Sequence, residues 1–149
     1  MASPTIKPLL AVSLQRRFAG PREKVFQAWT DPEALRRWWC PAGWTAGDIR
    51  VDLRPGGTYR IEMRLNGGGQ TVCVTGVFLQ VRPPEKLVYT WRWVGIWEWI
   101  PETRVTVEFR DVEGETELLL LHENFESPVL RDECRNVWLM GCDRLQAVL

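Results

Sequence analysis

The fold is decided by residues 127–149, which read SPVLRDECRNVWLMGCDRLQAVL. Ser127 suits a helix N-cap, and Pro128 suits the first helical turn, where its missing N–H would have no partner. Apolar residues then recur every three or four positions and share one helix face. That face comprises Leu130, Cys134, Val137, Trp138, Gly141, Leu145 and Val148. The segment predicts one long helix whose apolar face the rest of the chain must cover.

Strands with one apolar face each precede this helix. Alternating apolar residues predict strands within 9–20, 47–53, 59–65, 71–81, 87–93, 103–110 and 116–125. Turns are predicted between them at PGG (55–57), NGGG (66–69), RPPEK (82–86) and DVEGE (111–115). Gly76 inside the fourth strand indicates a β-bulge. Hairpin connections of this length predict an antiparallel sheet.

Two short helices separate the first strand from the second. Val25, Phe26 and Trp29 recur at helical spacing, and the pair Asp31-Pro32 ends this first helix. Asp31 can also cap the second helix. The predicted fold is α+β: a curved antiparallel sheet of six or seven strands wrapped around the long C-terminal helix, as one domain over 1–149. Space left between sheet and helix would form a cavity.

Composition narrows the classes of function. The 149 residues carry 19 basic and 19 acidic side chains, which argues against the basic face that nucleic-acid binding needs. The four cysteines form no C-x-x-C pair, and the single histidine, His122, is distant from them in sequence. We therefore expect free thiols, no metal site and no other cofactor. Without a membrane-length apolar run or a signal-peptide pattern at residues 1–14, we expect a cytoplasmic protein with no membrane association.

Five segments in this order resemble the START-like (SRPBCC) superfamily, whose members have the helix-grip fold. They read RRFAGPREKVFQAWTDPEALRRWW, VDLRPGGTYRIEM, TGVFLQVRPPEKLVYTWRW, TRVTVEFRDVEGETELLLLHENF and NVWLMGCDRL. The most similar branch is named after the C-terminal domain of the activator of the heat shock protein 90 ATPase. The resemblance implies a cavity for hydrophobic small molecules under the long helix. Some relatives are polyketide cyclases, and one branch stimulates a chaperone and so belongs to the stress response.

One position departs from this resemblance. Many relatives have Gly-Trp where this chain has Val137-Trp138. The larger Val137 side chain is expected to narrow the space under the helix.

Strand periodicity selects residues for the cavity wall, because alternate residues share a face. The odd-numbered residues Leu87, Tyr89, Trp91 and Trp93, and Val105, Val107 and Phe109 in the next segment, are apolar. Their even-numbered neighbours Thr90, Arg92, Thr106, Glu108 and Arg110 are polar, so the odd face should point inward. The predicted ligand-binding residues are Trp38, Trp39, Tyr59, Met63, Tyr89, Trp91, Trp93, Val107 and Trp138. Either Trp38 or Trp39 should point inward and the other should lie at the surface, near Trp44. A plain packed core of the same residues remains the alternative.

The stretch WRWVGIWEW, residues 91–99, permits two hairpins. A three-residue loop at 94–96 pairs Trp93 with Trp97, and all four indole rings then face inward. A two-residue loop at 95–96 pairs Trp93 with Glu98, which turns Trp97 and Trp99 outward. Outward tryptophans would be anchors for a protein partner.

His122 and Tyr59 are the candidates for acid–base chemistry. His122 shares an inward row with Leu118 and Leu120, whereas its neighbour Glu123 must point to the opposite face and cannot form a dyad with it. We therefore expect a structural histidine with satisfied hydrogen bonds. Two further polar candidates, Arg92 and Arg104, should point outward.

No catalytic motif emerges, so the sequence favours binding of a small hydrophobic or aromatic molecule without chemistry. A polyketide cyclase-like or hydrolase-like enzyme that uses His122 and Tyr59 is one alternative. The other is a protein-binding module that forms a homodimer or binds a chaperone through Trp97 or Trp99.

Overall fold

The structure of the protein is a computed structural model, which describes residues 9–149. The strands are β1 (Leu10–Phe18), β2 (Trp44–Val51), β3 (Thr58–Leu65), β4 (Thr71–Arg82), β5 (Lys86–Val94), β6 (Thr103–Val112) and β7 (Glu115–Phe125). The helices are α1 (Arg22–Thr30), α2 (Pro32–Trp38) and α3 (Pro128–Val148). The expectation about a signal peptide concerns residues 1–14, and of these residues 1–8 lie outside the described part of the chain.

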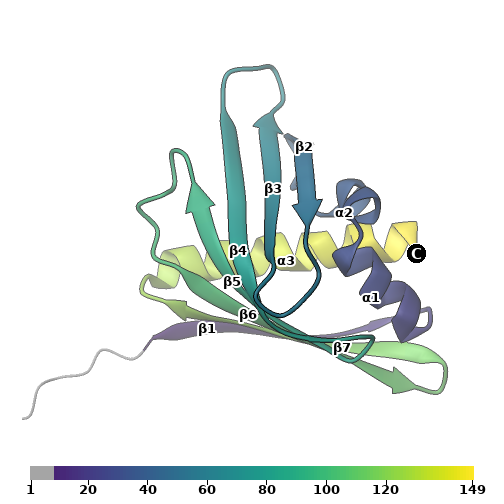
Figure 1. The fold of residues 1–149 in the computed structure, drawn as a ribbon. Helices are drawn as coiled ribbons and strands as arrows, with labels where there is room; N and C mark the ends of the chain where they lie inside the picture. The colour runs from purple at the N-terminus through teal and green to yellow at the C-terminus, as the bar shows by residue number, and fades with distance from the viewer. Residues whose placement is uncertain (1–8) are drawn as a thin grey trace, which may run out of the picture.

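All seven strands form one antiparallel sheet in the order β1-β7-β6-β5-β4-β3-β2. Consecutive strands from β2 to β7 pair as hairpins, whereas β1 pairs with β7. The two short helices carry the chain from β1 at one edge to β2 at the other, and α3 crosses the sheet (Figure 1). This is the predicted α+β helix-grip fold, with seven strands.

The inward face of the sheet follows the predicted periodicity. On β5 and β6 the odd-numbered residues from Leu87 to Trp91 and from Val105 to Phe109 are buried, while Arg92 and Arg104 are exposed. On β7 the buried row is Leu118, Leu120 and His122. Burial of each large apolar side chain in this row stabilises the fold by about 1.5–3 kcal/mol.

Helix α3 begins as predicted, with the Ser127 hydroxyl accepting a hydrogen bond from the Leu130 backbone N–H (3.3 Å). Its four buried residues, Trp138, Gly141, Cys142 and Leu145, all lie in the C-terminal half. In the N-terminal half Leu130 and Cys134 are half-buried, and Val137 is 40% exposed. The predicted apolar face is therefore buried only from Trp138 to Leu145: its first half does not pack tightly against other elements, and Val148, in the last helical turn, is 41% exposed contrary to the prediction.

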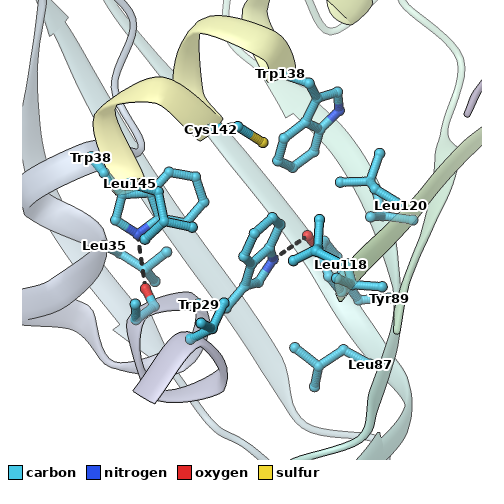
Figure 2. Packing of buried hydrophobic residues seen from close by; sticks show 14 of the residues in the cluster. Trp29, Leu35, Trp38, Leu87, Tyr89, Leu118, Leu120, Trp138, Cys142 and Leu145 are labelled. Atoms are coloured by element: carbon cyan, nitrogen blue, oxygen red, sulfur yellow. Dashed lines mark hydrogen bonds between the residues drawn. The ribbon is translucent and has the colours of Figure 1, made fainter. Parts of the chain in front are cut away.

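The short helices pack under the C-terminal half of α3. Figure 2 shows Trp138, Cys142 and Leu145 pointing from α3 toward the sheet, with Trp29 and Trp38 beside them. The Trp29 indole N–H donates to the Tyr89 hydroxyl (3.1 Å), and the Trp38 indole N–H donates to the Ala28 carbonyl (2.9 Å). Both buried donors are thus satisfied, and this end of the molecule is a packed core.

The N-cap of α2 is Asp31, as predicted, but its side chain makes no capping hydrogen bond. Instead its backbone carbonyl accepts from the Leu35 N–H (2.9 Å).

The predicted bulge at Gly76 is wrong. Gly76 pairs regularly with Tyr59, and the register of β4 against β5 shifts between Phe78 and Gln80 instead. Glycine is needed at 76 for another reason, since a Cβ there would lie 1.9 Å from the Thr90 carbonyl oxygen and 2.6 Å from the Tyr59 ring. The space that glycine leaves lets the Tyr59 hydroxyl donate to that carbonyl (2.6 Å).

Neither predicted hairpin forms at WRWVGIWEW. Trp91 pairs with Thr103, β5 ends at Val94, and residues 95–102 make a longer connection. Two turns shape it, closed by hydrogen bonds from Glu98 N to the Gly95 carbonyl (3.1 Å) and from Ile100 N to the Trp97 carbonyl (3.0 Å). Pro101 has no N–H to continue a ladder. The tryptophans at 97 and 99 therefore lie on a loop.

Within residues 9–149, no helix combines the length and the apolar character that a membrane crossing requires.

Candidate functional site

A cavity of about 440 Å³ lies beneath the N-terminal half of α3. The inner faces of β5, β6 and β7 form one wall, and the α2–β2 connection and the loop 95–102 complete it. It is lined by Trp38, Trp39, Pro41, Trp44, Met63, Trp91, Trp93, Trp97, Trp99, Ile100, Thr103, His122, Phe125, Leu130, Glu133, Cys134, Val137, Trp138 and Gly141. Leu130, Cys134 and Val137 on α3 are incompletely buried because they line this cavity.

Eight of the nine tryptophans line the cavity, and only Trp29 does not. Six of the eight rings contact one another in series: Trp39, Trp44, Trp91, Trp93, Trp97 and Trp138. Trp39 stacks on Trp91 (ring centroids 5.5 Å apart), and Trp93 meets Trp97 edge to face (4.9 Å). Aromatic contacts at these separations each stabilise by about 0.5–1.5 kcal/mol beyond burial. The wall is therefore a connected aromatic surface.

The cavity has a buried floor and an open mouth. Trp38, Trp91 and Trp138 are buried at the floor. At the mouth, Trp99 is 68% exposed and Val137 is 40% exposed. Solvent and small molecules can therefore enter between α3 and the loop 95–102.

Few polar groups interrupt this apolar wall. Glu133, exposed on α3, is the one charged residue among the lining residues that the structure describes. Deeper in the cavity the polar side chains are Thr103, His122 and Cys134. An apolar cavity with a few converging polar groups is typical of small-molecule sites.

His122 is the centre of the polar groups and is 1% exposed. Its Nδ1 lies 3.1 Å from the Trp138 indole N–H and 3.3 Å from Cys134 Sγ, and its Nε2 lies 2.7 Å from the Thr103 hydroxyl. None of these partners is a carboxylate, and Glu123 points away to pair with Arg104 (3.2 Å). The histidine has the satisfied hydrogen bonds that the sequence predicts.

Burial keeps both His122 and Cys134 neutral. It lowers the pKa of His122 from 6.5 to about 3. It raises the pKa of the Cys134 thiol to about 12. At neutral pH the two groups are an imidazole and a thiol, not the imidazolium–thiolate pair of a cysteine nucleophile.

The residues predicted from the sequence divide between cavity and core. Six line the cavity: Trp38, Trp39, Met63, Trp91, Trp93 and Trp138. Tyr59, Tyr89 and Val107 do not line it. The two tyrosines border a separate cavity of about 30 Å³ beside Trp29, and burial raises the pKa of both hydroxyl groups. The expectation that Trp38 or Trp39 would lie at the surface is wrong, since Trp39 is half-buried against Trp91.

The cavity wall contains residues beyond the predicted ligand-binding set. Thr103 has the inward, odd-numbered position of β6, so periodicity alone could have found it. Cys134 is 12 positions from His122 in the sequence, and the turn from β7 into α3 brings the two side chains into contact. Val137 lines the cavity without closing it. Trp97, Trp99 and Ile100 depend on the loop, which carries no periodic signal.

Residues 9–149 contain no group of three or more histidine, cysteine, aspartate or glutamate side chains arranged to hold a metal ion.

The family model described as Activator of Hsp90 ATPase homolog 1-like protein (AHSA1) matches residues 19–149. The chain belongs to this family. Membership in the AHSA1-like family agrees with the START-like fold. A comparison with curated proteins gives no match.

Solved structures of AHSA1-like proteins have the same fold. A protein from Chromobacterium violaceum is 26% identical, with a TM-score of 0.84 over 93% of this chain and 95% of that chain. The AHSA1 protein from Silicibacter pomeroyi is 25% identical, with a TM-score of 0.80 over 93% and 96%. An AHSA1-like protein from Aeromonas hydrophila, 23% identical, has a TM-score of 0.75 over 93% and 90% and shows the fold alone.

Proposed function

We propose that this protein binds a small hydrophobic, aromatic molecule in the cavity under α3 and performs no chemistry on it. The observation that carries the proposal is the aromatic wall of eight tryptophans around about 440 Å³. An apolar cavity of about 150 Å³ is already large enough to bind benzene. A site nearly three times larger accommodates a molecule of two or three fused rings.

The energetics favour such a ligand. Transfer of apolar surface from water contributes about 25 cal/mol per Å², and flat rings add stacking against indoles such as Trp39 and Trp91. The cavity is open at its mouth, so binding requires no unfolding of α3. Ligand efficiencies for small apolar molecules predict a Kd of roughly 10–100 μM for a naphthalene derivative.

Isothermal titration with 2-ethylnaphthalene tests this proposal. The variant Val137→Phe places a larger side chain at the cavity mouth, and Met140→Phe adds a similar ring on the same helix outside the lining residues, at a site 52% exposed. We expect binding to the native protein and to Met140→Phe, and binding at least about 10-fold weaker to Val137→Phe. Equal affinity of all three proteins would contradict the proposed location, and no binding to the native protein would contradict the function.

A second function, binding of a protein partner, is favoured by Trp99. Its side chain is 68% exposed and lines the same cavity as the exposed Val137, and large exposed tryptophans are frequent anchors in interfaces. Family membership makes an Hsp90-type chaperone one candidate partner, and a second copy of the chain is the other.

Light scattering of native protein and Trp99→Ala tests the homodimer, and a pulldown with purified Hsp90 tests the chaperone. A monomeric mass for the native protein together with no Hsp90 retention would contradict this second function.

The geometry does not support the enzyme alternative, because Tyr59 lies outside the cavity and both ring nitrogens of His122 are already hydrogen-bonded.

A further inference from the structure

We propose that the cavity selects neutral aromatic molecules that carry a hydrogen-bond acceptor, such as a ketone or ester carbonyl, over carboxylates of the same shape. This inference rests on the proposed function and specifies its ligand class. It follows from the direction of the hydrogen bonds through Trp138, His122 and Thr103, and from the charges around the cavity.

The direction of these hydrogen bonds starts at Trp138. An indole N–H can only donate, so the Nδ1 of His122, 3.1 Å away, must be the acceptor. In a neutral imidazole the proton is then on Nε2, which donates to the Thr103 hydroxyl oxygen at 2.7 Å. Trp138 thereby determines the tautomer of His122. In that tautomer the Thr103 hydroxyl oxygen is the acceptor of the hydrogen bond from His122.

The hydroxyl proton of Thr103 remains available as a donor. Thr103 lines the cavity, and among residues 9–149 its hydroxyl makes no hydrogen bond other than the one with His122. The Cys134 thiol does not add a second donor, because its sulfur lies 3.3 Å from the acceptor Nδ1 of His122 and its hydrogen is directed there. The polar part of the wall therefore offers the Thr103 hydroxyl hydrogen to a ligand, and a ligand oxygen can accept it.

The charges around the cavity disfavour an anionic ligand. Among the described lining residues there is no lysine or arginine, and the one charged group is the Glu133 carboxylate at the mouth. His122 cannot supply a positive charge, since both nitrogens are engaged and burial holds its pKa near 3. A buried carboxylate would lose its hydration without a compensating partner, which is strongly unfavourable.

Titration of three naphthalenes of similar shape into the native protein at pH 7 separates apolar burial, the hydrogen bond and the ligand charge. The three are 2-ethylnaphthalene, 2-acetylnaphthalene and 2-naphthoate. The variant Thr103→Val removes the hydroxyl at nearly constant volume, and Thr103→Ser retains it. Thr30→Val is the matched control, because Thr30 is also buried but bonds to the Phe26 carbonyl away from the cavity.

We expect Thr103→Val to weaken the binding of 2-acetylnaphthalene about 3- to 10-fold, which is the range for loss of one hydrogen bond. The Kd of 2-ethylnaphthalene should change by less than about twofold. Thr103→Ser and Thr30→Val should bind the ketone like the native protein. In the native protein 2-naphthoate should bind at least about 10-fold more weakly than the ketone. This comparison needs no variant and stands even if Thr103→Val does not fold.

Two results would overturn the inference while leaving the proposed function intact. In the first, Thr103→Val weakens the binding of the ketone and of 2-ethylnaphthalene equally, or weakens the binding of neither. The other is a carboxylate that binds as tightly as the ketone. If none of the three naphthalenes binds, the proposed function itself fails, and this inference fails with it.

Discussion

His122 makes the stability of this protein depend on pH in a way that can be predicted. Burial among Trp138, Thr103 and Cys134 lowers its pKa from 6.5 to about 3, so the folded protein does not accept a proton that the unfolded chain does. Stability is then complete above pH 6.5 and falls as the pH drops from 6.5 toward 3, because protonation favours the unfolded state.

The magnitude follows from the unfolded pKa. Each pH unit below 6.5 removes about 1.4 kcal/mol, so the free energy of unfolding should fall by about 2 kcal/mol between pH 7 and pH 5. A folded pKa anywhere below about 4 gives nearly the same loss over this range. The chain has a single histidine, so the imidazole contribution belongs to one residue.

Urea unfolding followed by circular dichroism at pH 7, 6 and 5 measures this loss, and the non-titrating variant His122→Gln is the control. The native protein should lose about 2 kcal/mol more than the variant over this range. Equal slopes for the two proteins would refute the reasoning. If the variant does not fold, the imidazole proton signals of the native protein provide the test, and a midpoint near pH 6.5 would refute it.

Three further changes should follow from the packing. Gly76→Ala forces a Cβ against the Thr90 carbonyl and should destabilise by about 2 kcal/mol or more in urea unfolding, and a neutral result would contradict the close approach. Leu145→Ala in the core should cost about 2–5 kcal/mol, whereas Val148→Ala, 41% exposed on the same helix, should change stability by less than about 0.5 kcal/mol. Cys134, whose pKa burial raises to about 12, should react with iodoacetamide at pH 8 at least about 100-fold more slowly than free cysteine by mass spectrometry, and a fast reaction would show a thiolate.

The sequence predicts which face of each strand is buried better than it predicts which of the buried residues line the cavity. Alternation identifies Tyr59, Tyr89 and Trp91 as inward residues, and all three are buried. Only Trp91 reaches the cavity, since Trp29 from α1 covers Tyr89 and bonds its hydroxyl. Where a helix lies along a strand depends on tertiary packing, which periodicity does not encode.

The loop 95–102 shows a second limit. Both expected hairpins assume that pairing continues beyond Gly95, but the turn at Glu98 and the missing N–H of Pro101 favour a longer connection. Local sequence signals were compatible with several turns, and the contact of Trp97 with Trp93 and Trp44 is a tertiary contribution. By contrast, the helix start at Ser127 was predictable because its cap is a local interaction.

The most direct test of the central claim uses the nine tryptophan indole N–H signals in a nitrogen-15 correlation spectrum. Addition of 2-acetylnaphthalene should shift the signals of the cavity residues Trp39, Trp91, Trp93 and Trp97, and these shifts should be lost in Val137→Phe. Saturable shifts of these four signals are the predicted result. Shifts confined to the exposed Trp99, or no shifts at ligand saturation, would contradict a binding site under α3.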